Sequence, residues 1–283
     1  MFKRVMVAVI GISALILILG FASPGATILL TMALCGVGAR ELMHAAAGKG
    51  GEKLLRMTVL VAAVIPAMIY EEAGRDKVQQ VQLAVLSNLP LTATLVLAFV
   101  LLLFLSAILD YTDQHRITFS DVTAAMFAGV VFPLMLSCLL LLRLEEYGQL
   151  LVFVPLGISF GSDTFALFAG LLCGKHKLTP VSPKKTVEGA IGGLLGGVIG
   201  LSLVKGIGLW LLGLPFMTWG QVVLVGLAGS VASQIGDLSF SVIKREFGVK
   251  DYGKILPGHG GVLDRFDSVT FVAPFIWLVL NIL

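Results

Sequence analysis

The stretch AVLSNLPLTATLVLAFVLLLFLSAIL, residues 84–109, decides the fold class, because it is long, apolar and free of charged residues. A helix needs about 20 predominantly apolar residues to cross the hydrocarbon core of a membrane. Similar runs cover most of the 283-residue chain, and they predict nine spans, give or take one or two. The nine predicted spans are residues 5–22, 26–43, 57–73, 84–109, 118–142, 149–173, 187–212, 219–240 and 268–283.

The composition excludes an ordinary soluble enzyme. Hydrophobic residues make up 57% of the chain and charged residues only 13%, about half the charged share of a soluble domain. Backbone groups in hydrocarbon must bond within their own segment, so the apolar runs are predicted to be helices. We therefore predict an all-α, polytopic membrane protein with about nine transmembrane helices. We treat residues 1–283 as one membrane domain, with scaffold or dimerisation helices in 1–117 and catalytic helices and loops in 118–283.

Basic residues predict the orientation of these spans. If the N-terminus is cytoplasmic, sixteen of the 20 Lys and Arg residues fall in inner loops, and only Arg75, Lys77 and Arg143 fall in outer loops. Cytoplasmic loops carry the excess of Lys and Arg in membrane proteins. We therefore predict a cell membrane protein of bacterial inner-membrane type. Its N-terminus and its strongly basic loops would be cytoplasmic, and its C-terminus would lie outside.

Several other classes of protein are disfavoured. The net charge of +3 is too small a surplus to suggest a nucleic-acid partner. The three cysteines lie far apart, so neither a disulfide framework nor a zinc site is indicated. The chain has no GxxxxGK(S/T) and no HExxH motif, which argues against a P-loop pump and a zinc protease.

Asp163 lies inside the apolar run from Leu150 to Cys173. An ionisable side chain at membrane depth costs at least about 2.5–3.5 kcal/mol on insertion scales, and by default it faces a polar cavity. The alternative is an aspartate that pairs with a Lys or Arg of another helix for packing alone. We predict that Asp163 has a functional role, as one of the substrate-binding residues.

Residues 174–189, GKHKLTPVSPKKTVEG, form a basic loop with four lysines and two prolines. Prolines stiffen a loop, so that less entropy is lost when it binds phosphate. A loop that only sets the topology would also be basic, but the order Ser-Pro-Lys-Lys-Thr is more specific than that role requires. The predicted substrate-binding residues of this loop are Lys175, Ser182, Lys184, Lys185 and Thr186.

Glycines recur at helical spacing from Gly189 to Gly200. Faces of small residues let membrane helices approach one another closely. We interpret this glycine face as a packing surface.

The densest cluster of polar residues is QIGDLSFSVIKREFGVKDYGKILPGHGGVLDRFD, residues 234–267. Asp264 and Asp267 are three apart, so on a helix both carboxylates project from one face. Together with Asp237 they would repel one another unless a cation or an arginine neutralised them. Magnesium prefers oxygen ligands, usually one or two carboxylates with water and substrate phosphate.

The turn at residues 257–261, Pro-Gly-His-Gly-Gly, lies within this cluster. Gly260 and Gly261 permit unusual backbone angles and let a ligand approach the main chain closely. His259 could donate a hydrogen bond to a phosphate, although a lone histidine is more often structural. Carboxylates for a metal and cations for phosphates therefore share one side of the membrane. This combination indicates phosphoryl or nucleotidyl transfer.

The same residues resemble the signature of the phosphatidate cytidylyltransferases, also called CDP-diacylglycerol synthases. The matching positions are Ser241, Ile243, Lys244, Arg245, Lys250, Asp251, Gly253, Leu256, Pro257, His259, Gly260, Gly261, Val262, Asp264, Arg265, Phe266 and Asp267. The earlier stretch from Ser162 through Gly174–Leu178 to Ser182–Gly189 is similar to the family's second conserved region. The motifs cover about residues 160–270.

The resemblance implies that CTP and phosphatidic acid give CDP-diacylglycerol and pyrophosphate, with Mg²⁺ as cofactor. It implies Asp237 and Asp264 as leading metal ligands, with Asp267 and Asp163 binding a second cation or orienting the first. It also implies a homodimer. The implied catalytic residues are Asp237, Asp264, Asp267, Lys244 and Arg265, and the implied substrate-binding residues of the second motif are Arg245, Lys250, Asp251, His259, Gly260 and Gly261.

Two other hypotheses stay open. One is a cytidylyltransferase or CTP-dependent kinase for another membrane lipid, such as an ether lipid or a polyprenol. The other is an anion transporter in which the basic loops form a vestibule and Asp163 couples ions. A transporter predicts inverted repeats, and none is visible in the sequence.

Overall fold

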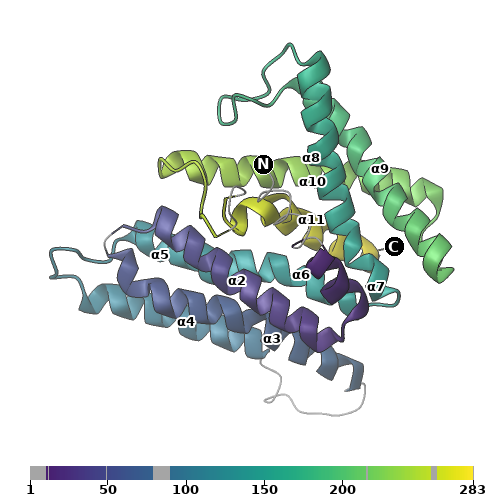
Figure 1. Cartoon of the computed structure of the whole chain (residues 1–283). Helices are drawn as coiled ribbons and strands as arrows, with labels where there is room; N and C mark the ends of the chain where they lie inside the picture. The colour runs from purple at the N-terminus through teal and green to yellow at the C-terminus, as the bar shows by residue number, and fades with distance from the viewer. Residues whose placement is uncertain are drawn as a thin grey trace. The chain divides into compact units, whose positions relative to one another are not determined.

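In the computed structural model of the chain, the regular structure is helical (Figure 1). The structure describes residues 11, 13–48, 50–78, 90–214, 216–255 and 260–282. Within these ranges, 8 helices are long and apolar enough to cross a membrane. They are Pro24–Ala46, Gly51–Gly74, Leu91–Leu109, Phe119–Leu144, Gly148–Cys173, Val187–Leu212, Trp219–Glu246 and Leu263–Ile282.

These helices match the last eight predicted spans one for one, from 26–43 to 268–283. The chain is therefore an all-α polytopic membrane protein, as the apolar runs predict. The first predicted span, 5–22, is described only at residues 11 and 13–22, which are mostly helical and end in a π-helix, η1 (Leu17–Phe21). Pro66 lies inside helix α3 (Leu55–Val78) and Pro274 inside helix α11 (Leu263–Ile282). Proline is tolerated in membrane helices because neighbouring groups satisfy the freed backbone atoms.

The chain divides into two compact units. Of the described residues, unit 1 contains those within 25–141 and 251–264, and unit 2 contains those within 11–24, 142–250 and 265–282. These boundaries differ from those of the predicted parts 1–117 and 118–283. The roles assigned to those parts stay a prediction.

Unit 1 is built from membrane helices that bury apolar side chains against one another. Its elements are α2 (Pro24–Ala46), η2 (Gly51–Leu54), α3 (Leu55–Val78), α4 (Leu91–Leu109), α5 (Phe119–Met126), η3 (Phe127–Val131) and most of α6 (Phe132–Leu144). Phe99 and Phe132 are almost fully buried. Each ring lies where a neighbouring glycine leaves room, because a Cβ on Gly129 or Gly38 would come within 2.8 or 2.6 Å of it. Small residues thus set the helix spacing in this core.

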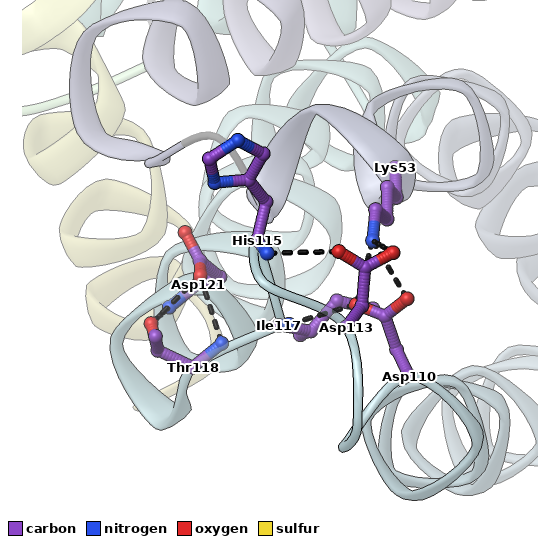
Figure 2. A network of polar contacts seen from close by, with 7 residues as sticks. All are labelled: Lys53, Asp110, Asp113, His115, Ile117, Thr118 and Asp121. Carbon is purple, nitrogen blue, oxygen red and sulfur yellow. Dashed lines mark hydrogen bonds and ion pairs between the residues drawn. The ribbon is translucent and has the colours of Figure 1, made fainter.

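Two loops of unit 1 are joined by the polar network of Figure 2. The Lys53 Nζ atom donates to Asp110 at 2.6 Å and to Asp113 at 3.1 Å. Asp121 is buried, and it accepts hydrogen bonds from the backbone N–H of Gly48 at 2.8 Å and of Thr118 at 2.9 Å. The Asp121 and Thr118 side chains also form a capping box at the start of α5. The charged loops after α2 and after α4 are therefore fixed to one another.

Unit 2 is organised around three closely packed helices. Its elements are η1, α7 (Gly148–Leu151), α8 (Phe153–Cys173), α9 (Val187–Leu212), α10 (Trp219–Glu246) and α11 (Leu263–Ile282) apart from its first two residues. Helices α8 and α9 run side by side (Figure 1), and a Cβ on Gly196 or Gly200 would collide with backbone of α8. A Cβ on Gly197 would come within 2.8 Å of the backbone of α10. The packing role predicted for the glycine face is confirmed, and it is served within the chain.

Two basic side chains that lie inside spans are satisfied by backbone oxygens in unit 2. Lys205 is buried on α9, and its Nζ donates to the carbonyl of Met217 and lies 4.9 Å from the ring centroid of Trp219. Arg143 donates to the carbonyl of Leu19 at 2.8 Å, at the π-helical turn η1. Both cations therefore have structural partners.

Candidate functional site

Three carboxylates come together in unit 2, one from each of three helices. Asp163 lies on α8, Asp237 on α10 and Asp267 on α11. They are close enough that Asp163 and Asp267 repel one another and that each is also repelled by Asp237. The hydroxyl of Ser268 lies 3.5 Å from an Asp163 carboxylate oxygen, and the N–H of Ser268 donates to Asp267 at 2.8 Å. Such a cluster needs positive charge nearby.

Lys185 provides part of that charge. Its Nζ atom forms an ion pair with Oδ2 of Asp237, and both side chains are about a quarter exposed. It also attracts Asp163 electrostatically, as does Arg265, while Lys244 attracts Asp267. The structure therefore brings together seven of the residues in or beside the predicted site: Asp163, Lys185, Asp237, Lys244, Arg265, Asp267 and Ser268.

Both interpretations of Asp163 stay open. Lys185 and Arg265 lie near enough to attract its carboxylate, and the hydroxyl of Ser268 lies beside it. These neighbours would serve a substrate site and a packing contact equally well. The functional role of Asp163 therefore stays a prediction.

The basic loop folds back on itself as a short hairpin. Lys177 and Thr186 form a β-bridge, and the N–H of Val187 donates to the carbonyl of His176 at 2.9 Å. Glu188 fastens the base of this hairpin, because its carboxylate accepts from the N–H of Lys175 at 3.1 Å and lies 2.6 Å from Nδ1 of His176. The hairpin thereby holds its exposed lysines, Lys175, Lys177 and Lys184, at the N-terminal start of α9.

The other predicted residues of the hairpin differ in their surroundings. Lys175 and Lys184 are exposed, and Ser182 is half-buried. Thr186 is buried, and its hydroxyl caps α9 by accepting from the N–H of Gly189 at 3.1 Å. The structure gives Thr186 a structural role, and its predicted contact with substrate stays a prediction.

The basic end of α10 is tied to the same hairpin. The Nε atom of Arg245 donates to the carbonyl of Val181 at 3.2 Å, and Lys250 is exposed beyond the end of the helix. Both residues belong to unit 2 with the three carboxylates.

Residues 251–255 and 260–264 of the second motif, called the glycine-rich segment below, belong to unit 1. Asp264 Oδ2 accepts hydrogen bonds from the N–H of Tyr252 at 2.9 Å and of Gly261 at 3.0 Å. Gly260 has a φ of 82°, which a residue with a side chain rarely adopts, so the predicted need for glycine at this turn is confirmed. Asp251 is exposed, and His259 lies outside the described residues.

Sequence reasoning did not single out Glu41 and Glu188, which hold the two motif-bearing segments. Glu41 is a carboxylate at the end of a predicted span, only 4% exposed. The same argument that drew attention to Asp163 could have found it, because ionisable side chains in membrane helices are expensive. Glu188 follows the Lys-Lys-Thr sequence in the first turn of α9, where carboxylates suit the helix dipole.

The sequence also contains Gly157-Ile158-Ser159-Phe160-Gly161, which fits the GxSxG pattern of serine hydrolases. That pattern works at a sharp turn between a strand and a helix, where the serine is exposed. Here Ser159 is fully buried in the middle of α8, and both glycines pack on α9. The structure therefore excludes a nucleophile elbow at this serine.

The donor set of unit 2 suits magnesium. Among the residues that the structure describes, no group of three His, Cys, Asp or Glu side chains is arranged as a metal site. Magnesium does not require one, because it usually takes one or two carboxylates and completes its shell with water and substrate phosphate. Asp237 and Asp267, with Asp163 nearby, can supply those oxygens.

Comparison with known proteins agrees with this chemistry. The model of the cytidylyltransferase family matches residues 2–283. The chain belongs to this family. Family members in bacteria named phosphatidate cytidylyltransferase are similar to it over most of its length.

Three of these relatives show the extent of the similarity. The Bacillus subtilis protein is 37% identical over 180 residues, which cover 61% of this chain and 64% of that protein. The Staphylococcus haemolyticus protein is 37% identical over 195 residues, or 69% of this chain and 70% of that protein. The Rickettsia bellii protein is 31% identical over 219 residues, or 74% of this chain and 95% of that protein.

Proposed function

We propose that the protein is a phosphatidate cytidylyltransferase that converts CTP and phosphatidic acid into CDP-diacylglycerol and pyrophosphate in phospholipid synthesis. Membership of the cytidylyltransferase family over residues 2–283, with relatives of that name, carries the proposal. The cluster of carboxylates and cations in unit 2 supports it, because a metal held by the carboxylates and the nearby cations would offset the repulsion between a triphosphate and a lipid phosphate.

The reaction needs charge control more than a general base. The phosphate of phosphatidic acid is anionic at neutral pH, so it can attack the α-phosphorus of CTP without first losing a proton to the enzyme. The bond from the α-phosphorus to the pyrophosphate then breaks. Mg²⁺, when bound, would offset the charge of the triphosphate and of the leaving pyrophosphate.

The residues of unit 2 divide this work. Asp237 and Asp267 would hold the magnesium ion, and Asp163 would orient them or hold a second cation. Asp264 stays a ligand proposed from the family pattern alone. The remaining phosphate charge would be neutralised by cations suited to phosphate contacts: Lys184, Lys185, Lys244, Arg245 and Arg265.

We further propose that the N-terminus and the motif-bearing loops face the cytoplasm, from which CTP arrives, and that the C-terminus faces outward. The direction of this proposal rests on the count of basic residues, while loop contacts within each unit agree with the predicted alternation of loops between the two sides. Lys53 joins two loops of unit 1 that the charge rule assigns to the inside, and Arg245 does the same in unit 2. Lys205 and Arg143 reach backbone at loops assigned to the outside.

The homodimer implied by the family resemblance is also a proposal. Light scattering of the purified protein in detergent would show twice the mass of the 30.0 kDa chain if it is correct. A monomeric mass at micromolar concentration would contradict it.

The activity is tested by supplying purified, folded protein with CTP, Mg²⁺ and a panel of lipids. We expect CDP-diacylglycerol from phosphatidic acid and loss of the activity on chelation of the metal. Faster turnover of a polyprenol or of an ether lipid phosphate would favour the alternative lipid substrates. Flux of an anion across liposomes in the absence of CTP would favour a transporter.

A further inference from the structure

Glu41 lies on α2 and binds the glycine-rich segment of unit 1, which is far from it in the sequence. Its Oε2 atom accepts a hydrogen bond from the N–H of Leu263 at 2.8 Å, and its Oε1 atom accepts one from Val262 at 3.1 Å. These donors lie at the start of α11, where backbone N–H groups have no partner within the helix. Both oxygens of one buried carboxylate are thus committed to consecutive backbone groups.

The segment is also shaped to fit around this carboxylate. A Cβ on Gly253 or on Gly261 would collide with Glu41 oxygens, so a larger residue at either position would displace the carboxylate from its hydrogen bonds. Gly261 in turn donates its N–H to Asp264, whose carboxylate is bonded to Tyr252 as well. Glu41 therefore contacts the segment on both sides of the turn, at Gly253 and at Gly261. Asp264 joins the same two sides through its hydrogen bonds to Tyr252 and Gly261.

We propose that Glu41 is a positioning residue for the reaction. Its carboxylate holds Gly253 and Gly261–Leu263 in place, and it thereby sets the position of Asp264 without touching substrate. This inference rests on the proposed function, since it assigns Glu41 a part in that reaction. A shift of about 1 Å in a reacting group can cost about 100-fold in rate, so a remote anchor of this kind can control turnover.

The test uses Glu41→Gln, which keeps the size of the side chain. The amide keeps one acceptor oxygen but points its NH₂ group at a backbone N–H, so one of the two hydrogen bonds is lost. We expect kcat to fall about 10- to 100-fold, with KM for CTP changed much less. We also expect the amides of Val262 and Leu263 to exchange hydrogen faster in the protein reconstituted in nanodiscs.

Asp121→Asn is the matched control. Asp121 is an equally buried carboxylate of unit 1 that also accepts from two backbone N–H groups, but it serves Gly48 and Thr118. It should lower the unfolding temperature by a similar amount, leave kcat within about twofold and leave exchange at Val262 and Leu263 unchanged.

Gly253→Ala approaches the same contact from the other side, in case Glu41→Gln does not fold. Its Cβ would press on Glu41, so it should reproduce the fall in kcat and the faster exchange. Normal kcat with normal exchange in the folded variants would overturn the proposal. An equal loss of kcat in Asp121→Asn would also overturn it, because the effect would then be general destabilisation. If the wild-type protein makes no CDP-diacylglycerol, the proposed function fails, while the exchange data still decide whether Glu41 holds the segment.

Discussion

The two motif-bearing segments are held in place by different means. The basic hairpin of unit 2, residues 174–188, is closed by hydrogen bonds among its own residues, with Glu188 at its base. The glycine-rich segment of unit 1 is held by Glu41, 221 and 222 positions away from the residues that it binds. A local motif thus carries its own support in one case and depends on a remote helix in the other. The predictions below test whether this difference affects the chemistry.

The largest effect is expected at the carboxylate to which the hairpin is joined. Asp237→Asn should lower turnover by at least about 100-fold, because it removes a proposed metal ligand and the partner of Lys185. Steady-state kinetics over a range of Mg²⁺ concentrations would measure it. A rate near that of the wild type, in protein that inserts normally, would remove Asp237 from the site.

Lys185→Met should have the next largest effect. A charge-assisted hydrogen bond is worth about 1.5–3 kcal/mol, so we expect kcat/KM for CTP to fall about 10- to 100-fold. Lys177→Met is the matched control on the same hairpin, because Lys177 is exposed and lies outside the predicted site. Equal losses in the two variants would mean that the hairpin contributes only general positive charge.

Glu188→Gln compares the local support with the remote one. It weakens the bonds to Lys175 and His176 at the base of the hairpin, and we expect kcat/KM for CTP to fall about 3- to 10-fold. The loss should appear mainly in KM, since the hairpin is proposed to bind phosphate. If Glu188→Gln lowered kcat and left KM unchanged, as is expected of Glu41→Gln, the two supports would not differ in function.

The smallest effect is expected from the network in Figure 2. The backbone N–H of His115 and the ammonium of Lys53 hold the pKa of Asp113 below its usual value. A carboxyl with a lowered pKa in the folded state adds stability above its usual pKa and loses it as the pH falls. Because the pair is exposed, the contribution is small.

Asp113→Asn should therefore leave turnover within about twofold. It should also slightly flatten the fall in unfolding temperature below pH 4, which calorimetry in detergent would measure. A large loss of activity would show that the loops of unit 1 act on the reaction.

The fold was predictable because a membrane helix can be recognised from the length and apolar composition of one contiguous run. The run 84–109 is uncharged, and it contains α4 (Leu91–Leu109). The glycines of α9 predicted close packing, and helices α8 and α10 occupy that face. What periodicity does not encode is a local change of helix type, such as the π-helix Phe127–Val131 in the middle of a span.

The candidate site was predictable in its residue types but not in its contacts. Asp163, Asp237 and Asp267 stand out because carboxylates are rare in apolar runs, and unit 2 brings them together. Two contacts join residues that are distant in the sequence: the ion pair of Lys185 with Asp237 and the hydrogen bond from the N–H of Leu263 to Glu41. Such pairings depend on tertiary packing, and a single sequence contains no signal for them.

The most direct test of the central claim is the fate of labelled phosphate from CTP. Purified protein is incubated with phosphatidic acid, Mg²⁺ and CTP labelled with ³²P at either the α- or the γ-position. A cytidylyltransferase must transfer the α-label to lipid and release the γ-label as pyrophosphate. We predict that result, and its loss in Asp237→Asn. Transfer of the γ-label to lipid would identify a kinase instead, and no transfer of either label by folded protein would contradict the account.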